Sequence, residues 1–172
     1  LLMSLMMTPV AMAWGPEDRP TYTMEKPAER ATFNSIIDNA AVGDERDFVR
    51  IAEKDPNATY TNDLELEAGK QYEVYIYYHN DASKDFNYTD DQRGIAMNVR
   101  LSSVFPHELA KGQSEYISGK ITSTNTEPLA VWDEAKVTAK QAMTLHYVEG
   151  SAKIYNRDNK DGTVLPISLF SE

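Results

Sequence analysis

Four aspartates lie close together in the polar stretch Asn80–Gln92, and their spacing is that of an oxygen-rich cation site. They are Asp81, Asp85, Asp90 and Asp91. Carboxylate oxygens, together with backbone carbonyls, are the ligands that Ca²⁺ takes in proteins. The stretch therefore predicts a calcium site. The same composition is also typical of a solvated loop with no bound ion, and the sequence leaves both interpretations open.

Three aromatic residues form a second candidate site. Tyr75 and Tyr77 share one side of a predicted strand, and Trp132 lies near another predicted strand. Flat rings of this kind can stack against sugar rings, which predicts a ligand platform. Aromatic residues on strands also commonly form cross-strand pairs that neighbouring side chains cover, so this alternative stays open.

Catalytic chemistry finds no support in the sequence. The three histidines, His79, His107 and His146, are isolated from one another and form neither an HxH nor an HxxxH pair. A nucleophile motif of the Gly-x-Ser-x-Gly type is absent from the chain. Paired carboxylates in a setting typical of glycoside hydrolysis are not recognisable either. We expect no catalytic residue, a non-enzymatic protein, and structural roles for the histidines.

The element that positions the aromatic residues is the stretch Gln71–Asn80. It alternates Tyr72, Val74, Ile76 and Tyr78 on one side with polar and aromatic residues on the other. A period of two over this length is typical of a half-buried β-strand. Similar patterns predict further strands at 31–37, 47–52, 64–67, 94–102, 114–124, 136–148, 152–155 and 163–170, with a weaker signal at 129–132.

Turn signals every 8–12 residues and the absence of a strong amphipathic helix favour an all-β fold. The predicted architecture is an antiparallel Ig-like β-sandwich with an extended N-terminal arm. We expect one shared core to contain Tyr72, Val74, Ile76, Val99, Leu101 and Leu145.

Three segments divide the chain. Residues 1–13 are apolar and end in Ala-Met-Ala, which predicts part of a secretory signal peptide cleaved before Trp14. Residues 14–30 carry three prolines and form the predicted arm. Residues 31–172 form the β-sandwich domain, which we expect to be truncated at its C-terminal end. The arm could pair with its own domain or mediate self-association by lying on a second copy.

The net charge and the lack of cysteine limit the kinds of partner and site that the protein can have. The 172 residues carry a formal net charge of −10, and none of them is a cysteine. Nucleic-acid phosphates and anionic membrane surfaces both attract basic proteins, so we expect no nucleic acid as a partner and no membrane insertion after signal removal. Without cysteine the chain can form neither disulfides nor thiolate metal sites.

Several short motifs follow a recognisable order along the chain: Gly69–Asn80, Ala96–Leu101, Pro106 and Tyr147–Ala152. In this order the chain resembles the Ig-like repeat of unknown function in bacterial and archaeal surface proteins. The opening WGPEDRPTYT and the later TFNSI and GDERDFVR also resemble uncharacterised secreted proteins of candidate-phylum bacteria such as Saccharibacteria. The resemblance implies an exported module at or near the cell surface and transfers no catalytic residue.

Together these observations predict a non-enzymatic secreted or cell-surface structural or interaction module, with adhesion among its expected roles. The alternative is a carbohydrate-binding module, and the sequence leaves open whether such a module depends on calcium. The partner expected in either case is a surface protein or a glycan.

Overall fold

The computed structural model describes residues 14–166, so the predicted signal segment lies outside the described residues. The described chain is almost entirely β-structure, arranged in several sheets, none of which closes on itself. Its strands are β1 (Val49–Glu53), β2 (Asp63–Leu66), β3 (Tyr72–Ile76), β4 (Arg100–Val104), β5 (Glu108–Leu109), β6 (Ser114–Thr122), β7 (Ala130–Ala139), β8 (Met143–Thr144), β9 (Lys153–Asn156) and β10 (Asn159–Val164).

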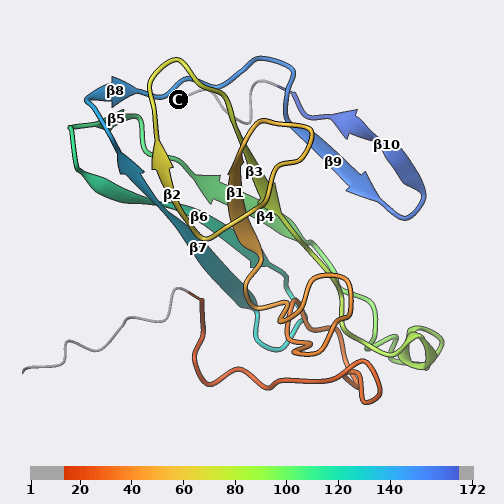
Figure 1. Ribbon diagram of the computed structural model, residues 1–172. Coiled ribbons are helices and arrows are strands. Elements are labelled where there is room, and N and C mark those ends of the chain that lie inside the picture. The colour runs from red at the N-terminus through yellow and green to blue at the C-terminus, as the bar shows by residue number, and fades with distance from the viewer. Residues whose placement is uncertain (1–13, 167–172) are drawn as a thin grey trace, which may run out of the picture.

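The largest sheet has the strand order β2-β7-β6-β4 (Figure 1). β6 and β7 are its two long antiparallel strands, with Ile117 opposite Ala135 and Ile121 opposite Val131. β2 runs parallel to β7, which differs from the predicted all-antiparallel arrangement. No hairpin joins these two strands, so turn geometry does not fix their relative direction.

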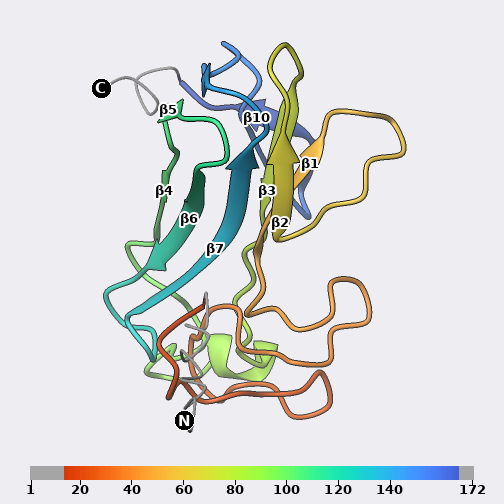
Figure 2. The same ribbon diagram turned by 60° about the vertical axis from the view of Figure 1, so that its left-hand side comes forward.

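A two-stranded antiparallel sheet, β1–β3, packs over β6 and β7 (Figure 2). Val49 and Ile51 of β1 are buried in the core between the two layers. The layers approach closely at Gly119 of β6, where an added Cβ would lie 2.7 Å from Cγ2 of Val49. Glycine therefore allows a contact between strands that any side chain would block.

The predicted core is only partly confirmed. Tyr72, Val74, Ile76 and Leu145 pack against the buried cluster as expected. Val99 and Leu101, by contrast, are both 46% exposed, so their predicted burial is wrong. The reason is their place in the fold, because β4 is the last strand of its sheet and lies beyond the area that β1 and β3 cover.

One local prediction fails, and two predicted strands prove to be continuous. Residues 31–37 do not form a strand, although most of them are buried, since they make only isolated bridges such as Phe33 with Asn80. The weak signal at 129–132 belongs to one long strand with the first part of the predicted strand 136–148, and this strand is β7.

The arm, residues 14–30, lies against its own chain below the two sheets (Figure 1). Gly15 exchanges two backbone hydrogen bonds with Trp132 of β7. Tyr22 bridges Ile36, and Ala28, which is fully buried, bridges Ala82. Pairing with its own domain is thus the arrangement that the arm adopts here, while exchange between two copies stays a prediction.

The described helical structure is a single short 3₁₀-helix, η1 (Lys84–Asn87), in the loop after β3. Within residues 14–166, no helix has the length and apolar character that crossing a membrane requires.

Candidate functional site

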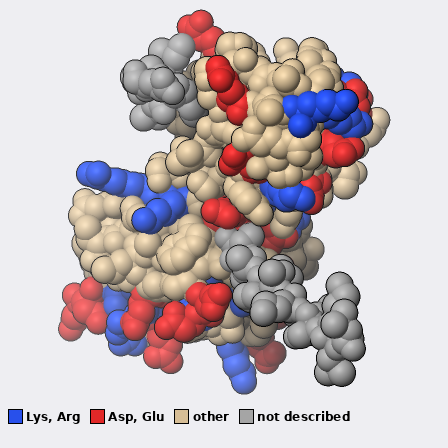
Figure 3. Space-filling model, turned by 90° about the vertical axis from the view of Figure 1, so that its left-hand side faces the viewer, with Lys and Arg blue, Asp and Glu red and all other residues tan. Residues whose placement is uncertain are grey.

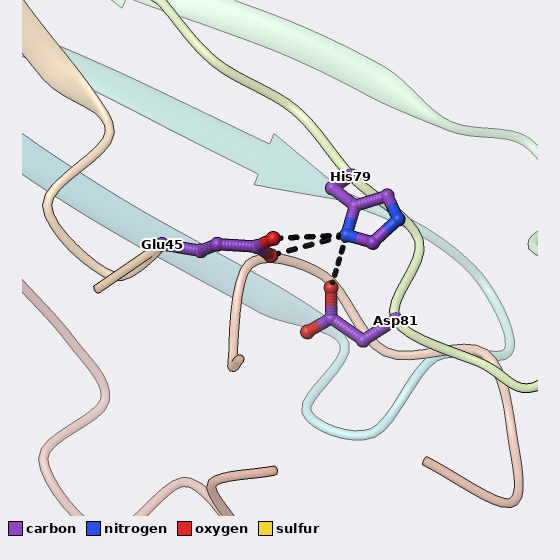
Figure 4. A group of neighbouring side chains, drawn as sticks. All are labelled: Glu45, His79 and Asp81. Atoms are coloured by element: carbon purple, nitrogen blue, oxygen red, sulfur yellow. Dashed lines mark hydrogen bonds and ion pairs between the residues drawn. The ribbon is translucent and has the colours of Figure 1, made fainter. Parts of the chain in front are cut away.

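Three titratable side chains, Glu45, His79 and Asp81, form a cluster outside the regular strands (Figure 4). Glu45 comes from the loop that precedes β1, and His79 and Asp81 come from the extended segment that follows β3. Both carboxylate side chains are completely buried, whereas the side chain of His79 is 38% exposed. The two carboxylates of the cluster are therefore shielded from solvent, whereas solvent reaches the imidazole.

Both carboxylates point at the same ring nitrogen of His79, and the other ring nitrogen points away from them (Figure 4). Nδ1 lies 3.1 Å and 3.2 Å from the two oxygens of Glu45. It also lies 3.1 Å from Oδ1 of Asp81. The ring N–H is directed at Glu45, and the buried Oδ1 of Asp81 has no hydrogen-bond partner.

Neighbouring groups hold the two carboxylates in place. Asn39 donates a hydrogen bond from Nδ2 to Oε1 of Glu45 at 2.6 Å. The backbone N–H of Ser35 donates to Oδ2 of Asp81. These contacts fix the direction in which each carboxylate faces the imidazole.

Asn34 positions the strand segment that carries His79. Its Oδ1 accepts the backbone N–H of His79 at 2.8 Å, and its Nδ2 donates to the carbonyl of Tyr77 at 2.9 Å. Asn34 adopts a φ of 48°, a left-handed conformation that asparagine tolerates better than most residues. A fully buried asparagine thereby replaces the backbone pairing that a regular strand at 31–37 would supply.

The electrostatics follow from this packing. The adjacent carboxylates of Asp81 and Glu45 raise the pKa of His79 to about 10, so the ring is protonated at neutral pH. Burial raises the pKa of Asp81 to about 7, although the contact with His79 opposes this shift. Burial acts to raise the pKa of Glu45 too, but hydrogen bonds from His79 and Asn39 prevail and lower it.

A second buried charge lies nearby, on Arg19 of the arm, which is 5% exposed. None of its guanidinium nitrogens has a hydrogen-bond partner among the described residues. Burial and the positive charge of Arg46 lower the pKa of Arg19 to about 10, while Asp44, Asp133 and Asp81 act in the opposite direction. The arm thus brings a positive charge into the surroundings of the buried acids.

The structure does not bring the four predicted calcium ligands together. Asp81 belongs to the buried cluster, whereas Asp85, Asp90 and Asp91 are exposed. Asp91 accepts a hydrogen bond from the hydroxyl of Thr89 at 2.7 Å. Among the described residues, no three of the four aspartates offer oxygens within 4.8 Å of one another. Calcium binding by this loop stays a prediction without a converging ligand set.

The three aromatic residues do not form one surface. Tyr75 lies on the outer face of the β1–β3 sheet, 5.7 Å from Tyr60 between ring centroids. Trp132 lies on the outer face of the other sheet, where Gly15 packs directly on its ring. Tyr77 is half-buried, and its hydroxyl lies 3.4 Å from Nδ2 of Asn39. Tyr75 and Trp132 therefore face opposite sides of the molecule.

One signal in the sequence could have indicated part of the cluster. His79 and Asp81 are two residues apart in an extended segment, and this spacing places both side chains on one face. Glu45 has no comparable signal, because it lies 34 positions before His79 and in a loop without periodicity.

A separate surface follows the free edge of the large sheet. β4 pairs with β6 on one side, and no described strand pairs with its other side. Large apolar residues along and next to this strand are exposed, namely Ile95, Met97, Val99, Leu101, Val104 and Phe105. We call these residues the β4 edge surface. An exposed edge of this kind offers unpaired backbone groups beside apolar side chains.

Comparison with known proteins returned no match: no protein-family model, no curated protein and no solved structure is similar to this chain.

Proposed function

We propose that this protein is a non-enzymatic, exported assembly module, and that two copies associate through their β4 strands. The observation that carries the proposal is the β4 edge surface, where a free strand edge coincides with exposed apolar side chains. Natural sheets usually protect such an edge with charges, prolines or a covering segment. Among the described residues, β4 has only Arg100 at its start and Pro106 beyond its end.

The sequence of β4 suits antiparallel pairing with itself. A twofold axis at Ser102 places Leu101 opposite the second copy's Ser103, and Arg100 opposite its Val104. No like charges then face each other, which favours cross-strand pairing. The same register places Val99 opposite Phe105 of the second copy. Leu101 lies opposite Ile121 of β6, so it is on the face of the sheet that carries the core. Pairing would extend this apolar face across both copies.

Two further features support an exported module. The resemblance of the chain to Ig-like repeats of surface proteins favours an Ig-like sandwich as the finer description of its all-β fold. The lack of cysteine means that stability does not depend on disulfide formation after export. On the face shown in Figure 3, acidic and basic side chains are interspersed with broad uncharged areas.

Because the chain has no cysteine, a single introduced thiol tests the pairing directly. In the Ser102→Cys variant, the proposed register places the two thiols opposite each other at the twofold axis. Mild oxidation should therefore give a disulfide-linked dimer in high yield. The matched control is Lys84→Cys, an exposed position on η1 at the other end of the molecule.

A dimer from Ser102→Cys but not from Lys84→Cys supports the proposal. Leu101→Lys in the Ser102→Cys background should then reduce crosslinking, because it places a charge at the apolar contact. Equal crosslinking of both cysteine variants, or a strictly monomeric parent protein in light scattering at millimolar concentration, would overturn it. A glycan array with the same protein tests the alternative carbohydrate-binding function.

A further inference from the structure

We propose that Glu45, His79 and Asp81 form a binding site for a divalent first-row transition-metal ion such as Zn²⁺. This site is independent of the proposed β4 association, because it lies in the loops below the sheets and shares no residue with the β4 edge surface.

The first argument is the spacing of the donor atoms. Nδ1 of His79 lies 3.1–3.2 Å from three carboxylate oxygens, and one donor atom from each residue falls within 4.8 Å of the others. Ligands about 2.0–2.2 Å from a zinc ion, at angles between about 90° and 109°, are themselves about 2.8–3.6 Å apart. Each carboxylate therefore already lies at the distance from the imidazole nitrogen that separates two ligands of one ion.

The second argument is that one N–H group of His79 faces two carboxylates and can donate a hydrogen bond to only one of them. An imidazole nitrogen carries at most one hydrogen, and this hydrogen points at Glu45. Oδ1 of Asp81 consequently has no hydrogen bond of its own, and its contact with the same nitrogen, at 3.1 Å, is an ion pair. A buried carboxylate oxygen without a hydrogen bond is costly. A metal ion between the three groups would bind all of them at once, because it coordinates several donor atoms, whereas the hydrogen of one N–H group points at one acceptor.

The third argument is the chemistry of the donor set. Two buried carboxylates supply two negative charges, which a divalent ion neutralises when the imidazole binds in its neutral form. A nitrogen ligand favours zinc and its first-row neighbours over Ca²⁺ and Mg²⁺, which prefer oxygen ligands throughout. The side chain of His79 is 38% exposed, so solvent reaches one side of the donor set.

The surroundings resemble those of an established metal site. Asn39 orients Glu45, and the backbone N–H of Ser35 orients Asp81, so neither carboxylate has to be rearranged to bind. Such outer contacts hold ligands in place and contribute to metal affinity. The competing explanation is a purely structural ion-pair cluster, in which protonated His79 pairs with both acids and Arg19 lies nearby.

Isothermal titration of the parent protein with ZnCl₂, after treatment with a chelator, separates these explanations. We expect one Zn²⁺ per chain. The near-isosteric variants Glu45→Gln and Asp81→Asn should each weaken binding about 100-fold or more, and Asn39→Ala, which removes only an orienting contact, about 10-fold. The control is the double variant His107→Gln/His146→Gln. These two rings lie 6.1 Å apart elsewhere on the molecule, and their loss should leave the site unchanged.

A second measurement uses the parent protein alone, so it does not require any variant to fold. In ¹⁵N-labelled parent protein, Zn²⁺ should move the resonance of Nδ1 of His79 to the range of a metal-bound nitrogen, while Nε2 keeps its proton. A ring that stays doubly protonated with excess Zn²⁺ would overturn the proposal. So would full zinc binding in folded Glu45→Gln, or loss of binding in the His107→Gln/His146→Gln control.

Discussion

The carboxylate of Asp133 accepts the backbone N–H of Phe48 at 2.6 Å, across 85 positions of sequence. The same oxygen, Oδ2, accepts the N–H of Val49 at 2.7 Å. Asp133 is an inward-facing residue of β7, and Val49 is the first residue of β1. One buried side chain thus fastens the start of the β1–β3 layer to the centre of the large sheet.

This contact predicts a pH-dependent stability. Burial raises the pKa of Asp133 from 3.8 to about 6, despite hydrogen bonds that act to lower it. Between about pH 4 and pH 6 the folded protein therefore holds a proton that the unfolded chain has released. The contribution of Asp133 to the free energy of unfolding is greatest below pH 4 and is lost as the pH rises through 6. The total loss is about 3 kcal/mol at most.

The measurement compares urea unfolding of the parent and of Asp133→Asn at pH 4 and pH 7. Asparagine does not titrate, so the stability of the parent relative to the variant should fall with rising pH. Parallel pH profiles for the two proteins would show that Asp133 has an ordinary pKa. Asp133→Ala should be destabilising at both pH values, because it leaves two buried N–H groups unpaired.

Gly119→Ala should destabilise the protein by about 1–3 kcal/mol, because the new methyl group overlaps Cγ2 of Val49 and the layers must move apart. Ser118→Ala, the neighbouring position on the opposite face of β6, serves as the control and should have little effect. Thermal or urea unfolding measures both. If the two variants are equally stable, β1 does not pack on β6 at this point.

Leu101 and Ile121 are direct cross-strand partners, yet they differ sharply in exposure, at 46% and 1%. Ile121→Ala should therefore cost about 2–5 kcal/mol. Leu101→Ala should cost about 0.5 kcal/mol or less, as at most surface sites. Urea unfolding at low protein concentration, where association is negligible, measures the difference. A large loss for Leu101→Ala in the monomer would mean that β4 is covered by the chain itself.

Deletion of residues 14–30 should lower the unfolding midpoint. The arm contributes backbone hydrogen bonds such as that from Tyr22 to Ser35 at 2.8 Å and that from Ala28 to Asp81 at 3.0 Å. Each is worth about 0.5–1.5 kcal/mol. The exposed variant Thr21→Ala is the matched control. A deletion variant that folds as stably as the parent, but loses an oligomer seen by light scattering, would instead favour arm exchange between copies.

The alternation of apolar residues was sufficient to predict much of the secondary structure. It indicated β1, β2, β3 and β6 close to their observed positions, because side-chain direction in a strand is a local property of the backbone. Turns at Gly43, Gly69 and Gly150 follow an equally local rule, because φ is positive there and glycine is favoured. The spacing of the turn signals and the absence of a strong amphipathic helix likewise indicated an all-β chain.

The tertiary structure alone decided which of these residues are buried and which polar groups meet. The sequence patterns around Leu101 and Ile121 are alike. The two side chains differ in exposure because the second layer covers β6 and not β4. The parallel direction of β2 and the meeting of Glu45 with His79 arise between segments that are distant in sequence. Periodicity carries no information about such contacts, because it describes each segment's own faces and not the segment that packs against them.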